Sequence, residues 1–366
     1  MLIKNTKYSY QDVSIVPARV SDISSRKECY PLDENGYFPL FTAPMSSVVD
    51  ENTVDNFEKN HIYSILPRTV EWEKRFEYGK KTKRWIAVSL SEFQNKFIEQ
   101  KINEEWFGMR VLIDIANGHM KELFDMVKVA KTRYGKDNLI VMIGNIANPE
   151  TYHEVVKCGA DMVRCSIGTG NGCTTSSNVS IHYPIASLLD EIKQIKNGYE
   201  PNKKLPKIIA DGGIRNYSDV IKALALGADY VMVGSVFSSL LGSAGDIFDK
   251  SMQEDSLDKS KVKYVGSSQF RLDVGQGNEV MIHPVKLFYG MASRRGQKDM
   301  KCAELKTSEG VEKIIPMIND ISGWIENFDS YLRSAMSYTN ARNLKDFQNN
   351  TKLILISQGT INAVNK

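Results

Sequence analysis

Short apolar runs alternate with longer amphipathic stretches along most of the chain. Residues 38–44 (FPLFTAP), 62–67 (IYSILP) and 85–90 (WIAVSL) have the length and composition of buried strands. Each run is followed by a charged stretch with helical spacing, at residues 50–61, 70–83 and 91–105. The pattern therefore predicts three units in which a strand is followed by a helix.

The same pattern continues with clearer signals. Residues 110–116 (RVLIDIA) precede residues 119–134, whose apolar positions fall on one helical face. Residues 139–146 (LIVMIGNI) precede a helix opened by Asn148-Pro149-Glu150, with proline at a favoured first-turn position. The remaining strand segments are 162–167, 207–210 and 228–234, and the helices after the first two are 181–196 and 217–227.

Eight near-continuous apolar strands fit a closed parallel barrel, because the strands of such a barrel are covered on both faces. The predicted fold class is α/β, a (β/α)8 TIM barrel. The length of 366 residues is compatible with one domain over residues 1–366, since α/β barrels often exceed the usual domain length. The alternative is a doubly wound open sheet, which usually carries G-x-G-x-x-G after its first strand; that motif is absent there.

After the eighth strand the chain departs from this repeat. Residues 236–315 form a long insertion, and a helical segment follows at about residues 320–347. Within the insertion, residues 264–269 and 279–286 are expected to pair as a hairpin, and residues 290–304 are polar and punctuated by glycine. Such an insertion after a barrel strand is typical of a lid or functional loop; the alternative is a partly ordered surface excursion.

The composition is typical of a globular protein and argues against several other classes of protein. Hydrophobic residues make up 42% of the chain and charged residues 25%, as in ordinary soluble globular proteins. The net charge of +3 is small and interspersed, which argues against binding to nucleic acid or membrane through a long-range field. Five cysteines without a C-x-x-C pair indicate neither a disulfide framework nor a zinc site. With no apolar leader and no membrane-length run, a cytoplasmic protein is expected.

One glycine-rich loop carries candidate chemistry. The strand at residues 162–167 runs into Gly168, Thr169 and Gly170, and Cys173 follows at the end of the loop. A thiolate presented by loop amides and flanked by hydroxyls is a plausible nucleophile. The alternative is a small buried cysteine in a turn, which is what most free cysteines are.

Polar residues recur where the predicted strands end. In a barrel these ends converge on one face. The pairs Gly212-Gly213 and Gly234-Ser235 stand where barrels commonly bind phosphate through backbone amides, which implies a phosphorylated ligand. The alternative is that these glycines only form turns. Asp211 would accept hydrogen bonds from a sugar diol or, alternatively, cap a turn. The converging residues are Ser46, Arg68, Ser89, Asp114, Asn145, Cys173, Asp211 and Ser235.

Many motifs together resemble the IMP dehydrogenase and GMP reductase family, from about residue 8 to about residue 347. The runs are YQDVSIVP, FTAPMS, IDIANGH, GTGNGCTT, IIADGGI, GADYVMVGS, LFYGMAS, TSEG and LRSAMSYTNARNLKDF. The resemblance implies a (β/α)8 barrel assembled as a homotetramer. It also implies a purine nucleoside monophosphate substrate and a nicotinamide cofactor.

The resemblance further implies roles for individual residues. Cys173 would form a covalent thioimidate at purine C2, with Thr175 and Glu309 managing protons. Phosphate contacts fall to Gly170, Asn171, Gly212, Gly213, Gly234 and Ser235, and ribose contacts to Asp211. Base contacts fall to Met291, Ala292, Ser293 and Gly310, and Ser46 is a further substrate contact. The cofactor pocket comprises Arg68, Asp114, Ala116 and Asn117, and the carbonyls of Gly168, Gly170 and Cys173 match a loop that binds a monovalent cation such as K⁺.

The flap, residues 290–310, indicates the branch of the family. Dehydrogenases hydrolyse the thioimidate with an Arg-Tyr pair on the flap, whereas here Arg294-Arg295 is followed by Gly296. The short flap, the Tyr183-Pro184 pair and the run LRSAMSYTNA resemble GMP reductases. We therefore expect NADPH-dependent reductive deamination of GMP to IMP and ammonia.

Several positions depart from the family pattern. Asn171 stands where a phosphate-binding Ser is usual, Ser46 where Asp follows Ala-x-Met, and Lys306 where reductases have Arg. Residues 66–68 (LPR) replace a His-Lys-His run. A deoxynucleotide or modified purine therefore stays open as substrate. The other functions left open are an IMP dehydrogenase using NAD, a non-catalytic purine-nucleotide-binding relative and an FMN-dependent barrel oxidoreductase.

Overall fold

The fold was taken from a computed structural model of the chain. It describes residues 5–102, 104–135, 137–170, 174–250, 256–302, 304–357 and 359–361. Among these residues, no helix combines the length and apolar character that crossing a bilayer requires.

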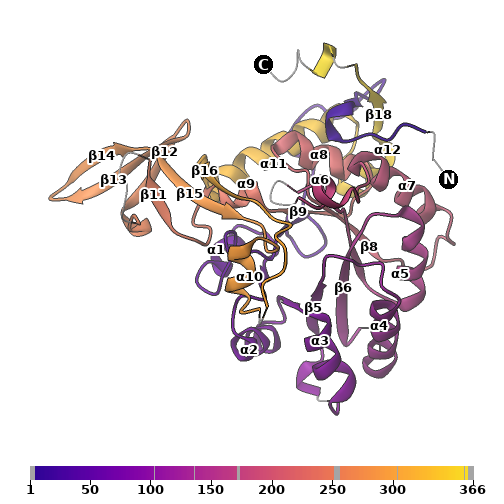
Figure 1. The fold of residues 1–366 in the computed structure, drawn as a ribbon. Coiled ribbons are helices and arrows are strands. Elements are labelled where there is room, and N and C mark those ends of the chain that lie inside the picture. The colour runs from indigo at the N-terminus through magenta and orange to yellow at the C-terminus, as the bar shows by residue number, and fades with distance from the viewer. Residues whose placement is uncertain are drawn as a thin grey trace.

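Eight parallel strands form the predicted barrel (Figure 1), which confirms the fold class. Their order is β2-β9-β8-β7-β6-β5-β4-β3. The barrel closes where the Tyr63 amide donates to the Leu40 carbonyl (3.0 Å) and the Thr42 amide donates to the Tyr63 carbonyl (2.9 Å). The strands are β2 (Leu40–Thr42), β3 (Ile65–Leu66), β4 (Trp85–Val88), β5 (Met109–Asp114), β6 (Leu139–Ile146), β7 (Met162–Cys165), β8 (Lys207–Asp211) and β9 (Tyr230–Val233).

Alternating strand residues divide between two apolar clusters. In β5, Leu112 joins a cluster with Met142, Ile209 and Met232 from other strands of the barrel. Val111, the preceding residue, belongs to the larger cluster that also contains helix residues. Because successive side chains of a strand point to opposite faces, both faces of the barrel wall are covered. This double burial is why the strands read as near-continuous apolar runs.

Helices follow most strands, as predicted, with shifted bounds. The predicted helix at 91–105 is instead α3 (Leu90–Phe93), a π-helix (Gln94–Glu99) and a short 3₁₀ turn (Glu104–Trp106). The predicted helix at 181–196 begins only after Pro184, because proline is favoured at a helix start. The others are α1 (Val54–Lys59), α2 (Trp72–Thr82), α4 (Lys121–Tyr134), α5 (Tyr152–Cys158), α6 (Thr175–Val179), α7 (Ile185–Asn197) and α8 (Tyr217–Ala225).

Two segments from near the opposite ends of the chain pair beside the barrel; Figure 1 labels one of them, β18. β1 (Val13–Val16) pairs antiparallel with β18 (Lys352–Leu355), a pairing that the sequence analysis did not predict. Only short α9 (Ser235–Ser238) directly follows β9, and the long helix α11 (Ile321–Tyr338) packs Trp324 and Phe328 into the outer cluster. α12 (Leu344–Asn350) follows it.

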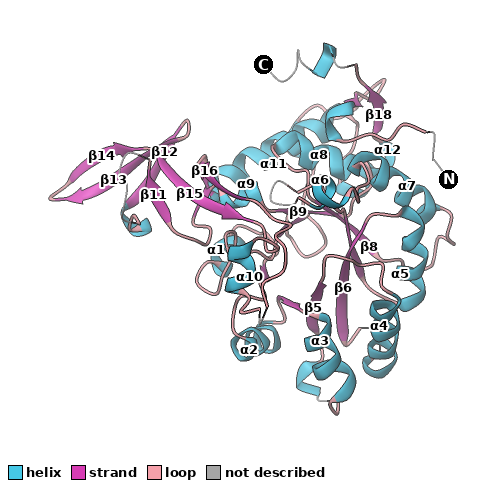
Figure 2. Cartoon of the chain, viewed as in Figure 1, coloured by secondary structure: helices cyan, strands magenta, loops and turns pink. Residues whose placement is uncertain are grey.

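The insertion builds two small antiparallel sheets (Figure 2). One contains β11 (Ile247–Asp249), β15 (Pro284–Tyr289) and β16 (Glu312–Pro316), with α10 (Arg294–Asp299) inside the flap. The other contains β12 (Val262–Gly266), β13 (Gln269–Gly275) and β14 (Asn278–Ile282), and it projects from the barrel. A short parallel pair, β10 (Leu240–Leu241) and β17 (Asn319–Asp320), lies at the base of the insertion.

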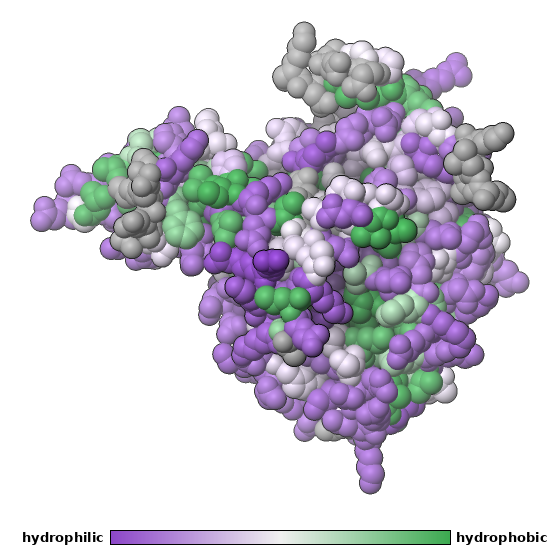
Figure 3. All heavy atoms as spheres, in the orientation of Figure 1, coloured by the Kyte–Doolittle hydropathy of each residue, from purple (hydrophilic) through white to green (hydrophobic). Residues whose placement is uncertain are grey.

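The predicted hairpin was wrong in its pairing. Residues 264–269 and 279–286 do not pair with each other; β13 lies between β12 and β14 and pairs with both. The turn before β13 places Ser267 (φ 51°) and Ser268 (φ 57°) in the left-handed region. Such a turn is usually marked by Asn or Gly, and neither residue is present here to indicate it. Val265, Val274 and Met281 are exposed on this sheet, where Figure 3 shows hydrophobic surface.

Candidate active site

A buried charge network spans the mouth of the barrel where β5, β7 and β8 end. Arg164 Nη1 donates to Asp114 Oδ1 (2.6 Å), and Arg164 Nη2 and Nε donate to Asp211 Oδ2 (2.8 and 3.1 Å). The sequence analysis expected both aspartates there but missed Arg164. One signal for Arg164 was present in the sequence. It lies two residues after Met162 in an apolar strand, and that spacing places both side chains on the same face of the strand.

The two carboxylates explain why Arg164 can be buried. Burial disfavours its charge, but Asp211 and Asp114 outweigh that penalty and raise its pKa. Burial likewise opposes ionisation of Asp114, but Arg164 and Arg68 hold the pKa of that carboxyl below its usual value. Both groups are therefore charged at neutral pH, and the network is fixed in place.

Asp211 keeps one oxygen for a ligand. Asn145 Nδ2 also donates to its Oδ2, at 2.7 Å, so three donors share that atom. No hydrogen bond reaches Oδ1 from any residue that the structure describes. A carboxylate oxygen held rigidly at the barrel mouth is suited to accept hydrogen bonds from a sugar diol.

The glycine turn after β8 packs against the loop after β7. Gly212 has φ +92°, and a Cβ there would lie 2.5 Å from Thr169 Oγ1 and 3.1 Å from the Gly170 nitrogen. Only glycine allows this approach. Gly213 is also left-handed, with φ +75°. The two predicted phosphate loops, 168–170 and 212–213, therefore lie together.

The third predicted phosphate turn lies beside the end of β2. A Cβ at Gly234 would lie 3.6 Å from both Ala43 Cβ and Met45 Sδ. Ser235 begins α9 directly after this turn. Gly234 thus packs beside Met45, and the next residue, Ser46, is another predicted substrate contact.

The flanks of the cysteine loop meet the flap. Asn171 and Cys173 lie outside the described residues, so their predicted roles stay predictions. After the loop, Thr175 Oγ1 donates to Glu309 Oε2 (2.8 Å), and the Thr174 amide donates to the Glu309 carbonyl (2.8 Å). The two residues expected to manage protons are therefore in direct contact.

The predicted base contacts gather at the two ends of the flap. The Glu309 amide donates to the Ala292 carbonyl (3.2 Å), and the Ser293 hydroxyl accepts from the Gly296 amide at the start of α10 (3.1 Å). A Cβ at Gly310 would lie 2.6 Å from the Ser293 nitrogen, so this backbone packs tightly. Met291 comes two residues after the end of β15, and its sulfur lies 4.0 Å from Ser46 Oγ.

The guanidinium of Arg68 lies beside Asp114, and not all of its N–H groups are hydrogen-bonded. Its Nε lies 3.5 Å from Asp114 Oδ2 but makes no hydrogen bond among the described residues. Its Nη2 donates to the sulfur of Met300 (3.3 Å), a weak acceptor. An underused guanidinium at the barrel mouth fits the polar part of a nicotinamide cofactor. Ala116 and Asn117, in the loop after β5, are exposed.

The predicted cation loop lies only partly within the described residues, so it stays a prediction. The Gly168 carbonyl already accepts a hydrogen bond from Ser176 Oγ (2.8 Å), and Cys173 is outside the described part of the chain. Across the described ranges, no cluster of three or more His, Cys, Asp or Glu side chains could hold a metal ion.

Other proteins resemble this chain over nearly its whole length. A family model described as IMP dehydrogenase / GMP reductase domain matches residues 7–364. The chain is 29% identical to a GMP reductase of Caenorhabditis elegans, over 97% of this chain and 93% of the relative. It is also 29% identical to a GMP reductase of Onchocerca volvulus (97% and 92% covered) and 27% identical to human GMP reductase 1 (97% and 87% covered).

Proposed function

Because the chain belongs to the IMP dehydrogenase/GMP reductase family, we propose that it reductively deaminates GMP, or a closely related purine nucleotide, to IMP and ammonia with NADPH. The family comprises NAD(P)-dependent purine nucleotide oxidoreductases. The observation that carries the proposal is the contact between Thr175 and Glu309, which joins the cysteine loop to the flap.

In the proposed reaction the Cys173 thiolate attacks C2 of the purine, and a bond forms between sulfur and C2. The bond from C2 to the exocyclic nitrogen breaks, and the nitrogen leaves as ammonia. Glu309, relayed by the Thr175 hydroxyl, supplies the proton that this nitrogen needs, because an unprotonated amide-like nitrogen is a poor leaving group. When bound, NADPH supplies the hydride that C2 accepts. The bond from sulfur to C2 then breaks, which releases IMP and restores the thiolate.

The surrounding residues would hold the substrate in place. The loops at 168–170 and 212–213 and the turn at 234–235 offer backbone amides for the phosphate. Asp211 Oδ1 would accept from the ribose hydroxyls. The flap residues Met291, Ala292, Ser293 and Gly310 would contact the base, and Arg68, Asp114, Ala116 and Asn117 would line the cofactor pocket.

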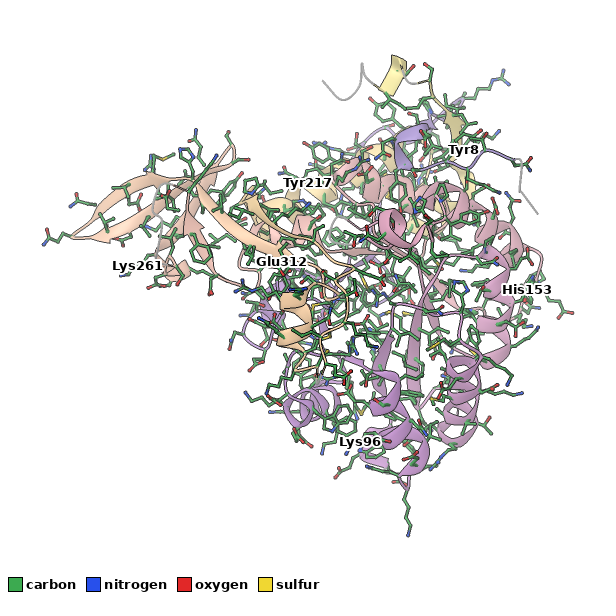
Figure 4. All side chains as sticks on the ribbon, viewed as in Figure 1. Tyr8, Lys96, His153, Tyr217, Lys261 and Glu312 are labelled. Carbon is green, nitrogen blue, oxygen red and sulfur yellow. The ribbon has the colours of Figure 1, made fainter. Side chains whose placement is uncertain are left out.

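The flap supports a reductase rather than a dehydrogenase. Residue 296 is glycine, and a Cβ there would lie 2.6 Å from the Met291 carbonyl oxygen, so no larger side chain fits. Arg295 lies over the Tyr289 ring, 5.5 Å from its centroid. Its amide donates to Glu312 (3.2 Å), the residue of β16 that is labelled in Figure 4. No tyrosine follows Arg295 to help activate water. A single barrel domain, the homotetramer and the K⁺ loop remain proposals taken from the family.

The test is incubation of the chain with GMP and NADPH while absorbance at 340 nm, IMP and ammonia are followed. We expect loss of NADPH with matching amounts of both products. Cys173→Ala should abolish turnover, whereas Cys302→Ala, at an exposed cysteine, should keep it. Reduction of NAD with IMP instead would show a dehydrogenase, and nucleotide binding without either reaction would show a non-catalytic relative.

A further inference from the structure

The imidazole ring of His119 joins the loop after β5 to the loop after β6. Its Nε2 accepts a hydrogen bond from the Ala147 amide at 3.0 Å. Its Nδ1 lies 3.0 Å from the hydroxyl oxygen of Thr151. His119 stands two residues before α4, and Thr151 is the last residue of the 3₁₀ turn (Pro149–Thr151) that leads into α5. One side chain therefore bridges two successive connections between a barrel strand and its helix.

The two partners of the ring decide where its proton sits. A backbone amide can only donate, so Nε2 must carry a lone pair and the proton of the neutral ring must be on Nδ1. From Nδ1 the proton is donated to the Thr151 hydroxyl. A second proton, on Nε2, would face the amide hydrogen of Ala147 and break that hydrogen bond. The bridge therefore holds only while the imidazole is neutral.

The surroundings of His119 favour the neutral ring. Burial lowers the pKa of the imidazole below its ordinary value, and no charged side chain among the described residues contributes to the shift. The charged groups of the packed elements have partners elsewhere. Glu150, in the turn before α5, faces His153 at 3.6 Å, and Lys121, at the start of α4, pairs with Asp125. The ring is therefore uncharged at neutral pH and gains a proton only in the acid range.

The bridged loop carries two of the predicted cofactor contacts. Ala116 and Asn117 are exposed between the end of β5 and His119. The His119 amide donates to Asn117 Oδ1 at 3.1 Å, which orients this side chain. Its Nδ2 makes no hydrogen bond with the residues that the structure describes. An amide nitrogen held in this way can donate to a carbonyl oxygen of a ligand, such as the carboxamide of a nicotinamide.

The same loop also rests on Asn145. The Gly118 amide donates to the Asn145 carbonyl at 2.8 Å, and a Cβ at Gly118 would lie 2.6 Å from that oxygen. Asn145 in turn donates to Asp211, the predicted ribose contact, at 2.7 Å. Asp211 is held independently by Arg164, at 2.8 and 3.1 Å. A shift of the loop would therefore move the cofactor contacts while Asp211 keeps its place.

We propose that His119 is a positioning residue for the nicotinamide cofactor: its neutral imidazole fastens the loop that carries Ala116 and Asn117 to the loop after β6, and protonation of the ring releases that loop. This inference rests on the proposed function, which assigns the loop to the cofactor. Cofactor affinity should therefore depend on His119 and fall in acid. Both hydrogen bonds of the ring lie away from the predicted phosphate loops, so GMP affinity should change little.

The test follows NADPH binding through the fluorescence of the cofactor, without GMP, from about pH 8 to about pH 5. His119→Ala should weaken NADPH about tenfold at the upper end of this range. His119→Gln should recover part of that loss, because its amide oxygen can still accept from Ala147. GMP affinity, measured by calorimetry, should change less than about threefold in both variants. Equal losses for NADPH and GMP would overturn the inference.

The pH profile separates positioning by the neutral ring from packing alone. Wild-type affinity for NADPH should fall more steeply in acid than that of His119→Gln, whose side chain cannot gain a proton. The cofactor's own phosphate titrates equally in both titrations, so the difference between the profiles belongs to His119. His153→Gln, at the histidine of α5 that Figure 4 labels, is the matched control and should keep the wild-type profile. Identical profiles for the wild type and His119→Gln would overturn the inference, even if His119→Ala does not fold.

A measurement without any ligand tests the bridge itself. The chain has five histidines, and NMR spectra of the ¹⁵N-histidine-labelled protein show which ring nitrogen of each carries the proton. The His119 signal, identified by its loss in His119→Gln, should show a proton on Nδ1 at neutral pH; a proton on Nε2 would overturn the inference. Failure of the wild type to bind NADPH at any pH would refute the proposed function. NADPH binding that the His119 variants leave unaltered would refute the role of His119 alone.

Discussion

Thr175 and Glu309 lie 134 positions apart in the sequence, yet the threonine hydroxyl donates to the glutamate carboxylate at 2.8 Å. The contact joins the helix after the cysteine loop to the end of the flap. The Thr174 amide, which donates to the Glu309 carbonyl at 2.8 Å, fixes the same junction through the backbone. The flap therefore holds a carboxylate beside the residues that follow Cys173.

Glu309→Gln should slow turnover while leaving substrate affinity nearly intact. The amide cannot pass a proton to the departing nitrogen, so kcat should fall about 10²- to 10⁴-fold, with KM for GMP changed only a few-fold. Steady-state kinetics of purified variants measure this. Glu312→Gln, just beyond the flap, is the matched control, and a similar loss there would count against a proton role for Glu309.

Arg68→Gln should weaken the cofactor and spare the nucleotide. The guanidinium has a buried Nε without a hydrogen bond and a thioether as its other acceptor, so its donors are available to a charged or polar ligand. Loss of a charged hydrogen bond should raise KM for NADPH about tenfold or more. Lys74→Gln, at an exposed lysine, should change neither KM. A rise in KM for GMP alone would move Arg68 to the substrate site.

Arg164→Met should destabilise the fold strongly. It leaves two carboxylates without their shared cation, and breaking a buried ion pair costs about 3 to 5 kcal/mol. Urea unfolding followed by circular dichroism measures the change. Arg342→Met removes an exposed arginine and should leave the midpoint nearly unchanged. Equal midpoints for the two variants would show that the network contributes little.

The lowered pKa of Asp114 predicts how the stability of the fold depends on pH. Its pKa in the folded state is below the unfolded value of about 3.9, so the carboxylate stabilises the fold at higher pH. That contribution should disappear as the pH falls through the folded pKa, below about 4. The difference in unfolding free energy between the wild type and Asp114→Asn should therefore shrink as the pH is lowered through the folded-state pKa of Asp114. A constant difference would show that ionisation of Asp114 is not involved.

Gly212→Ala should disturb the phosphate loops more than backbone strain alone explains. Its φ of +92° and the close approach of Thr169 both oppose a side chain. Gly266→Ala is the matched control, because φ is +97° there but nothing lies within 4 Å of the added carbon. Each should lose about 1 to 2 kcal/mol from strain, and only Gly212→Ala should also weaken GMP binding in titrations. Equal GMP affinities would separate Gly212 from the nucleotide.

The sequence predicted the barrel because strands covered on both faces must be apolar at nearly every position. It also predicted which polar residues stand at strand ends, and Asp114, Asn145 and Asp211 do meet there through one network. It missed Arg164, which connects them. An arginine inside an apolar strand has no local partner in sequence, so its two carboxylates appear only once the barrel is closed.

The strand pairings in the insertion and near the termini could not be predicted from the local pattern of apolar and polar residues. β1 and β18 join segments at opposite ends of the chain, and each alone is too short to indicate its partner. The contacts of Asp299 with Ser46 and Tyr289 were missed for a similar reason. Asp299 looks like an ordinary charge on a polar helix until the fold brings Ser46 and Tyr289 to it.

The nucleophilic role of Cys173 is tested most directly by mass spectrometry of the chain after incubation with GMP in the absence of NADPH. We predict a nucleotide adduct that maps to the peptide containing Cys173, together with released ammonia, and loss of the adduct when NADPH is added. An unmodified Cys173 in a chain that still converts GMP to IMP would contradict the covalent mechanism.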